Sequence, residues 1–191
     1  IPALMTNKQE SESHKPNYHA TNINAWIATL FSKKPKSYQY LDEYLKPLFV
    51  GLQEISIEQQ ELRFIFQLDR EQKTLKFSQL SYGERIFVLW AAILASVKLD
   101  LISLCVWDEP ENYISLIEIQ HYFMELHQAF HQKAQFIATT HNPETMRMFS
   151  SDDIFILKRE HHLQPIRLYP VQEMNVQHDI VEAIKAGLVE L

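Results

Sequence analysis

Two short apolar runs, each followed at once by polar residues, constrain the fold of this chain most. The first run, residues 101–107, precedes Asp108 and Glu109, and the second, residues 135–140, precedes His141. Apolar runs of this length predict central parallel strands that are covered on both faces. In open α/β sheets, the groups that bind ligands gather where such strands end. The sequence therefore predicts an α/β fold with these polar residues at one sheet edge.

The paired acids indicate phosphoryl-transfer chemistry. Two adjacent carboxylates at the end of a buried strand are costly unless they are used. We expect Asp108 to hold Mg²⁺ through water, and Glu109 to orient or deprotonate an attacking water. The alternative is a solvated loop after a strand. It explains acids at this place but not the motifs on either side of them.

A capping box precedes the first apolar run, with Ser81 at the N-cap and Glu84 three residues later. The helix that follows is apolar nearly all round, which predicts burial. Gly83 lies at its exposed N-terminus, where free N–H groups and the helix dipole favour phosphate. Taken alone, the motif fits an ordinary capped core helix. The motifs that follow favour the interpretation that Ser81, Gly83 and Glu84 bind nucleotide.

The positions of the glycines exclude a phosphate-binding loop. A phosphate-binding loop of the form G-x-x-x-x-G-K-[ST] needs two glycines five positions apart. The three glycines of this sequence, Gly51, Gly83 and Gly187, include no such pair. The chain therefore carries no P-loop.

The rest of the chain predicts the surrounding elements. Residues 1–21 are polar and indicate a loop or insert, and residues 22–191 are expected to form the domain. Cap signals and apolar spacing predict helices, and alternation predicts strands. We expect helices over residues 22–31, 38–52, 86–94, 115–131 and 180–188, another helix that starts at Pro143 with Asn142 as its cap, a meander over residues 55–77, and a hairpin of residues 154–158 and 165–169.

Composition adds broad limits. A chain of 191 residues suits one domain, and a net charge of -6 argues against a broad nucleic-acid-binding surface. The single cysteine, Cys105, lies in an apolar run and fits a core residue in a reducing cytoplasm. No segment has the length of a membrane span. His127 and His131 lie one helical turn apart, but without a metal-binding frame they predict only a polar helix face.

The three motifs in this order resemble the C-terminal half of an ABC-type ATPase of the RecF/SMC/OLD-like branch. The resemblance covers about residues 38–170 and implies the C-terminal part of a P-loop NTPase fold, with central parallel strands, flanking helices and two antiparallel regions. It implies that Ser81 and Gly83 match the signature motif, which contacts the γ-phosphate of ATP on the opposite protomer. Asp108 and Glu109 then match the Walker B acid and catalytic glutamate, and His141 matches the switch histidine. ATP and Mg²⁺ are the implied cofactors.

The sequence also departs from the family pattern. Ser115 and Leu116 stand where many relatives have a histidine-proline pair, no Q-loop glutamine is recognisable, and the Walker A lobe is absent. Copies of this chain alone would lack a complete nucleotide site. We therefore expect the P-loop upstream, in which case the chain is a fragment, or in another subunit. The residues after His141 are too few for an OLD-type nuclease domain, so a nuclease would be a separate partner.

Two functions remain open at this point. The first is an ATPase module in DNA repair, DNA maintenance or phage defence, which dimerises around ATP and has DNA or a nuclease as a partner. The second is a non-catalytic module that keeps the ATPase fold for protein association. A histidine-rich metallohydrolase is set aside, because the histidines form no ligand frame.

Overall fold

The computed structural model describes residues 12–112, 114–131, 133–159, 161–174 and 180–186. The described residues belong to two compact units. One unit lies in Ile1–Ser103 together with Gln132–Ala134, and the other lies in Leu104–His131 together with Gln135–Leu191. The predicted boundary at residue 21 remains a prediction.

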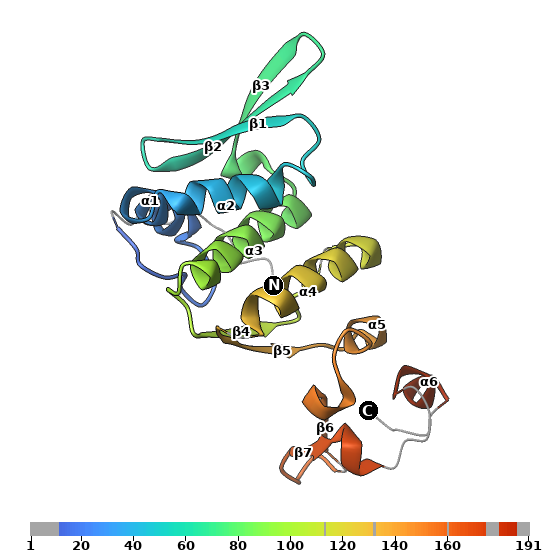
Figure 1. Ribbon diagram of the computed structural model, residues 1–191. Helices are drawn as coiled ribbons and strands as arrows, with labels where there is room; N and C mark the ends of the chain where they lie inside the picture. The colour runs from blue at the N-terminus through green and yellow to red at the C-terminus, as the bar shows by residue number, and fades with distance from the viewer. Residues whose placement is uncertain (1–11, 113, 132, 160, 175–179, 187–191) are drawn as a thin grey trace. The chain divides into compact units, whose positions relative to one another are not determined.

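The first unit combines three helices with an antiparallel sheet (Figure 1). The sheet has the strand order β1-β2-β3, in agreement with the predicted meander. Its elements, in chain order, are α1 (Ile23–Lys33), α2 (Lys36–Leu45), β1 (Leu52–Glu58), β2 (Glu61–Leu68), β3 (Glu71–Lys76), the 3-10 turn η1 (Phe77–Gln79) and α3 (Tyr82–Lys98).

Helix α3 forms the centre of this unit. Every residue from Ile86 to Val97 is buried, as its apolar sequence predicts. Ser96 is the polar exception, and its hydroxyl donates to Ala92 O at 2.7 Å within the helix. Helix α2 packs against α3 and buries Leu41 and Leu45. The N-terminus of α3 is therefore held in place by the buried body of the same helix.

The prediction of one helix over residues 38–52 is wrong in extent. Helix α2 ends at Leu45, and β1 begins at Leu52. Pro47 follows the helix end, and a proline has no N–H to donate to the preceding turn. Leu48 and Phe49 continue the apolar spacing, but they lie in turns whose N–H groups both donate to Leu45 O.

Residues 12–21 form an irregular segment that is tied to the start of α1. Asn22 stands at the N-cap, yet its side chain makes no capping bond. Its Oδ1 accepts from Asn17 N at 2.9 Å, and its Nδ2 donates to Ser13 Oγ at 2.6 Å and Lys15 O at 3.0 Å. Residues 1–11 of the expected loop lie outside the described residues, and residues 12–21 contain no helix or strand.

The second unit contains a parallel strand pair and an antiparallel hairpin (Figure 1). β4 and β5 pair in parallel, and β6 and β7 pair antiparallel, which confirms the predicted α/β class and the hairpin. Its elements are β4 (Leu104–Asp108), α4 (Leu116–Phe130), β5 (Gln135–Thr139), α5 (Pro143–Met146), η2 (Ser151–Asp153), β6 (Phe155–Lys158), β7 (Arg167–Pro170), η3 (Val171–Met174) and α6 (Ile180–Lys185).

The β4–β5 pair is covered on one face only, which corrects the expectation of two buried faces. Phe136 of β5 meets the rings of Phe123 and Phe130 of α4, with centroids 6.3 and 5.5 Å apart. On the opposite face Leu104, Val106 and Ile137 are exposed, Val106 by 70%. Apolar runs predict burial of both faces of a strand, but none of the described residues covers this second face of the β4–β5 pair.

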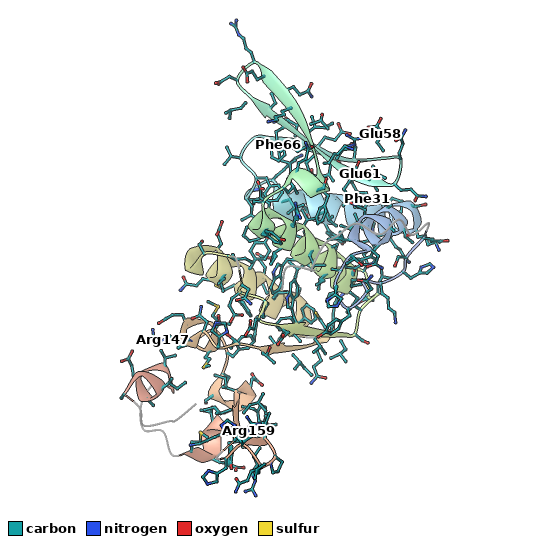
Figure 2. All side chains as sticks on the ribbon, turned by 180° about the vertical axis from the view of Figure 1, so that it is seen from behind. Phe31, Glu58, Glu61, Phe66, Arg147 and Arg159 are labelled. Atoms are coloured by element: carbon teal, nitrogen blue, oxygen red, sulfur yellow. The ribbon has the colours of Figure 1, made fainter. Side chains whose placement is uncertain are left out.

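Helices α5 and α6 are joined by a small apolar cluster and by one arginine. Met146, Ile156, Val171 and Val181 pack together. Arg147, labelled in Figure 2, donates to both carboxylate oxygens of Glu144 at 3.0 and 2.8 Å and to Glu182 of α6 at 2.9 Å. This part of the unit is therefore held by packing and by ion pairs.

Cys105 of β4 is half-buried, so it is less enclosed than the predicted core residue. Burial raises the pKa of its thiol to about 11, so the thiol stays protonated at neutral pH. No helix among the described ranges has the length and apolar character needed to cross a membrane.

Gly51 joins the first unit's helices to its sheet and cannot be replaced without strain. Its φ is +83°, and a Cβ at this position would lie 2.7 Å from Gln67 O. We expect Gly51→Ala to lower the free energy of unfolding by about 1–3 kcal/mol, measured by urea titration. The exposed neighbour Val50 provides the control, because Val50→Ala should change stability by about 0.5 kcal/mol or less. Equal effects of the two variants would contradict this account of Gly51.

Candidate functional site

The predicted signature motif forms the capped start of α3. Glu84 N donates to Ser81 Oγ at 3.3 Å, and Ser81 N donates to Glu84 Oε2 at 2.6 Å, so the capping box is complete. Ser81 and Tyr82 are exposed and Gly83 is half-buried. Because a helix N-terminus leaves backbone N–H groups without intrahelical acceptors, the Ser81 hydroxyl and the Gly83 N–H are the candidate groups for an anion here.

Arg85 fixes the loop that leads into this helix. Its guanidinium donates to Leu80 O at 2.9 Å and to Ser78 O at 2.5 Å. The same group lies 5.9 Å from the Phe77 ring centroid and 5.4 Å from the Tyr82 ring centroid. Arg85 therefore adds positive charge beside the helix N-terminus and fixes the backbone segment that leads to Ser81. Arg85 was not among the predicted site residues, although it directly follows the motif.

Asp108 lies at the end of β4 on the exposed face of the strand pair. The register places it opposite Thr139, whose hydroxyl donates to Asp108 Oδ1. Thr139 also receives the Glu109 N–H, at 3.1 Å through its carbonyl and at 3.2 Å through its hydroxyl. One threonine of β5 therefore holds the carboxylate of Asp108 and the backbone of Glu109. The Thr139-Thr140-His141 sequence was the available signal for it.

Glu109 is held in an unusual backbone conformation. Its φ is +50°, in the left-handed region, which costs roughly 1–2 kcal/mol for a residue with a side chain. Asn112 Nδ2 donates to Glu109 Oε2 at 2.6 Å, so the carboxylate is oriented from its own loop. Strained conformations of this kind persist where surrounding contacts fix them, and they cluster at functional sites.

The structure brings Glu109 and His141 together. His141 Nδ1 lies 3.0 Å from Glu109 Oε1, across 32 residues of sequence. Since an ionised carboxylate only accepts hydrogen bonds, this contact requires the proton on Nδ1. The imidazole then presents Nε2 to whatever binds beside the strand ends. Asn142 caps the following short helix α5, accepting from Glu144 N at 3.0 Å, as its sequence predicts.

Glu111 and Thr140 form a second contact between the same two loops. The Thr140 hydroxyl donates to Glu111 Oε1, and Glu111 is buried. Neither Glu111 nor Thr140 was among the predicted site residues, although both lie within the motif segments. The signal was the third acid of Asp108-Glu109-Pro110-Glu111, which a solvated loop would not bury.

The predicted site residues therefore form two groups. Asp108, Glu109 and His141 come together in the second unit, whereas Ser81, Gly83 and Glu84 form the capped helix start in the first unit. Their catalytic, metal-binding and nucleotide-binding roles remain predictions.

The histidine pair of α4 gives no metal centre. The rings of His127 and His131 stack with centroids 5.4 Å apart. Within the described residues, no three or more His, Cys, Asp or Glu side chains are grouped so that they could hold a metal ion. A structural metal site of that kind has no support in this part of the chain.

Comparison with family models gives one match over most of the chain. A model described as "AAA domain, putative AbiEii toxin, Type IV TA system" matches residues 6–147. This stretch includes every predicted site residue. Among curated proteins, none matches the sequence.

Solved structures of SMC ATPases share the fold. A structure described as "Structural biochemistry of ATP-driven dimerization and DNA stimulated activation of SMC ATPases" has a TM-score of 0.60 at 12% identity, over 86% of this chain and 98% of that one. An Smc head bound to the C-winged helix domain of ScpA gives 0.58 at 13%, over 77% and 46%. The head of Pyrococcus yayanosii Smc, with a coiled coil and joint, gives 0.57 at 15%, over 85% and 31%.

These identities show a shared fold and nothing finer. The chain spans nearly all of the first of these structures, but less than half of the two Smc heads. The activities and partners of whole SMC proteins therefore do not transfer to this chain by similarity alone.

The capping box generates a stability prediction. Ser81→Ala removes the acceptor for Glu84 N, so the free energy of unfolding should fall by about 1 kcal/mol in a urea titration. Ser81→Asp keeps an N-cap acceptor and should stay near wild type. Ser78→Ala, an exposed serine just before the motif, is the neutral control. A Ser81→Ala chain as stable as the Ser78→Ala chain would contradict the capping role.

Proposed function

Because the chain belongs to the AAA domain family described as "AAA domain, putative AbiEii toxin, Type IV TA system", we propose that it is an ATP-hydrolysing half-site module. In this proposal the chain contributes the signature, Walker B and switch-histidine groups of an ATPase that dimerises around ATP. The observation that carries the proposal is the 3.0 Å contact between Glu109 and His141 at the ends of paired parallel strands.

The contacts of Glu109 support the role of general base. Its carboxylate is oriented by Asn112 at one oxygen and meets His141 at the other. A water at this carboxylate would lose its proton to Glu109 as it attacks the γ-phosphate. His141 would donate its Nδ1 proton in a hydrogen bond to Glu109 Oε1 and would place Nε2 towards the phosphate.

The donor set beside Glu109 fits Mg²⁺. Asp108 supplies hard carboxylate oxygens on an exposed strand end, and Thr139 orients one of them. Mg²⁺ is commonly held by one or two carboxylates, water and phosphate oxygens. Bound with ATP, Mg²⁺ would neutralise charge on the phosphates, and Asp108 would hold it through water.

The capped start of α3 supports the signature role. Ser81 Oγ, the Gly83 N–H and the charge on Arg85 all favour an anion at this helix end. Glu84 contributes by fixing Ser81, because its carboxylate is already bonded to the Ser81 N–H. We propose that this end contacts the γ-phosphate of ATP held by another protomer or subunit.

The P-loop must then come from outside this chain, either from an upstream segment or from another subunit. The uncovered face of the β4–β5 pair supports this part of the proposal. Leu104, Val106 and Ile137 are exposed there, whereas parallel sheets are ordinarily covered on both faces. A P-loop-bearing segment that completes the sheet would bury them.

The wider setting follows the family and its relatives. The first of the matched structures is described by ATP-driven dimerisation and DNA-stimulated activation of SMC ATPases. We propose by analogy a cytoplasmic ATPase that acts as a homodimer or larger assembly in DNA repair, DNA maintenance or phage defence. DNA or a separate nuclease is the expected partner.

The catalytic role of Glu109 is tested by Glu109→Gln in the complete ATPase. We expect ATP turnover to fall by about 10²–10⁴-fold, because the amide cannot accept the proton of water. ATP-dependent assembly should persist, as measured by light scattering. Glu173→Gln is the matched control, since Glu173 is exposed and lies outside the site. Wild-type turnover in Glu109→Gln would exclude Glu109 as the base.

The half-site arrangement is tested by calorimetric titration of Mg-ATP into the 191-residue chain. We expect no detectable binding, because the chain has no P-loop to cradle the phosphates. The complete ATPase should bind under the same conditions. Tight binding by the chain alone would refute the half-site. A complete protein that neither binds nor hydrolyses ATP would favour the competing function, a non-catalytic interaction module.

A further inference from the structure

The loops after β4 and β5 are joined by two side-chain contacts of different character. The contact between His141 and Glu109 lies in solvent, since these side chains are 70% and 37% exposed. An exposed pair of this kind contributes little stability, because water screens it and both side chains lose freedom. The contact between Thr140 and Glu111 is different, because Glu111 is only 5% exposed. The exposed contact therefore depends on something else to hold its geometry.

The Thr140 hydroxyl connects the buried carboxylate to the backbone around His141. Its single proton goes to Glu111 Oε1, and its oxygen accepts the Asn142 N–H at 3.0 Å. The other acceptor near this hydroxyl, Asn142 O, lies 3.5 Å away. Thr140 and Asn142 flank His141 in the chain, so fixing both sets the direction in which the imidazole leaves the backbone.

Stability alone does not account for a glutamate at position 111. Within the described residues, Glu111 Oε2 is buried and has no hydrogen-bond partner. A half-satisfied buried carboxylate costs free energy, which an apolar side chain of similar size would avoid. Glu111 also belongs to the loop of Glu109, since Asn112 N donates to Glu109 O and Ile114 N donates to Glu111 O, both at 3.2 Å. Its carboxylate therefore connects the base's loop to the histidine's loop.

We propose that Glu111 is a positioning residue of the ATPase site. Through Thr140 it orients His141 so that Nδ1 meets Glu109 Oε1. The effect of Glu111 on ATP hydrolysis rests on the proposed function. The hydrogen bonds that link Glu111, Thr140 and Asn142 lie within this polypeptide and do not depend on that proposal. Glu111 itself need not touch ATP.

The hydrogen bonds that link Glu111, Thr140 and Asn142 are tested by amide hydrogen exchange, measured by NMR on the 191-residue polypeptide. Glu111→Ala and Thr140→Val should each speed exchange of the Asn142 N–H by about 10-fold or more, with β4 and β5 amides unchanged. Glu111→Gln and Thr140→Ser should stay near wild type, because they keep the acceptor and the hydroxyl. The double variant Glu111→Ala/Thr140→Val should be no faster than either single variant, since both break one link.

Unchanged Asn142 exchange in Glu111→Ala and Thr140→Val would overturn the proposal. So would a uniform rise through β4 and β5, which would make Glu111 a packing residue only. Turnover of the complete ATPase gives the second readout. Glu111→Ala should lower kcat by about 10- to 100-fold with the KM for ATP unchanged, and Glu111→Gln should restore it. If the wild-type complete protein hydrolyses no ATP, the proposed function fails, and the exchange measurement still decides the role of Glu111.

Discussion

The parallel pairing of β4 with β5 is the constraint on which the candidate site depends. Its register sets Asp108 opposite Thr139, so the two strands end at the same level. From there the Glu109 N–H reaches the carbonyl and hydroxyl of Thr139, and the next loop brings His141 to Glu109. Groups 32 residues apart in sequence meet because parallel strands align their carboxyl ends. A shift of one register position would separate the acids from the threonine that orients them.

The two compact units differ in how completely they bury their apolar side chains. Around α3 the first unit buries a continuous apolar segment, Ile86–Val97, and presents a capped helix end on it. In the second unit α4 covers one face of the β4–β5 pair, and Leu104, Val106 and Ile137 stay exposed on the other. This asymmetry fits a half-site, in which the same added segment would cover the sheet and supply the phosphate loop.

Elements governed by neighbouring residues were predicted well. The capping box at Ser81 and the Asn142 cap are complete, because each depends on residues only two or three positions apart. Likewise, strand alternation predicted the β1–β3 meander. The helix expected over residues 38–52 was overextended because the apolar spacing continued past Pro47, which has no N–H to donate to a helical turn. The prediction that β4 and β5 are buried on both faces was also wrong. An apolar run shows that a strand can be buried, but it does not show which neighbouring segments are present to cover it.

The sequence by itself determined the family resemblance, the absence of a P-loop in this chain and the residues that end the two strands. These depend on residue types and spacing, which the sequence contains in full. Only the tertiary structure decided that Glu109 takes a left-handed backbone, that its carboxylate meets His141, and that Glu111 is buried against Thr140. The last two contacts join residues about thirty positions apart, and their geometry follows from strand register and loop conformation. No local pattern encodes that geometry.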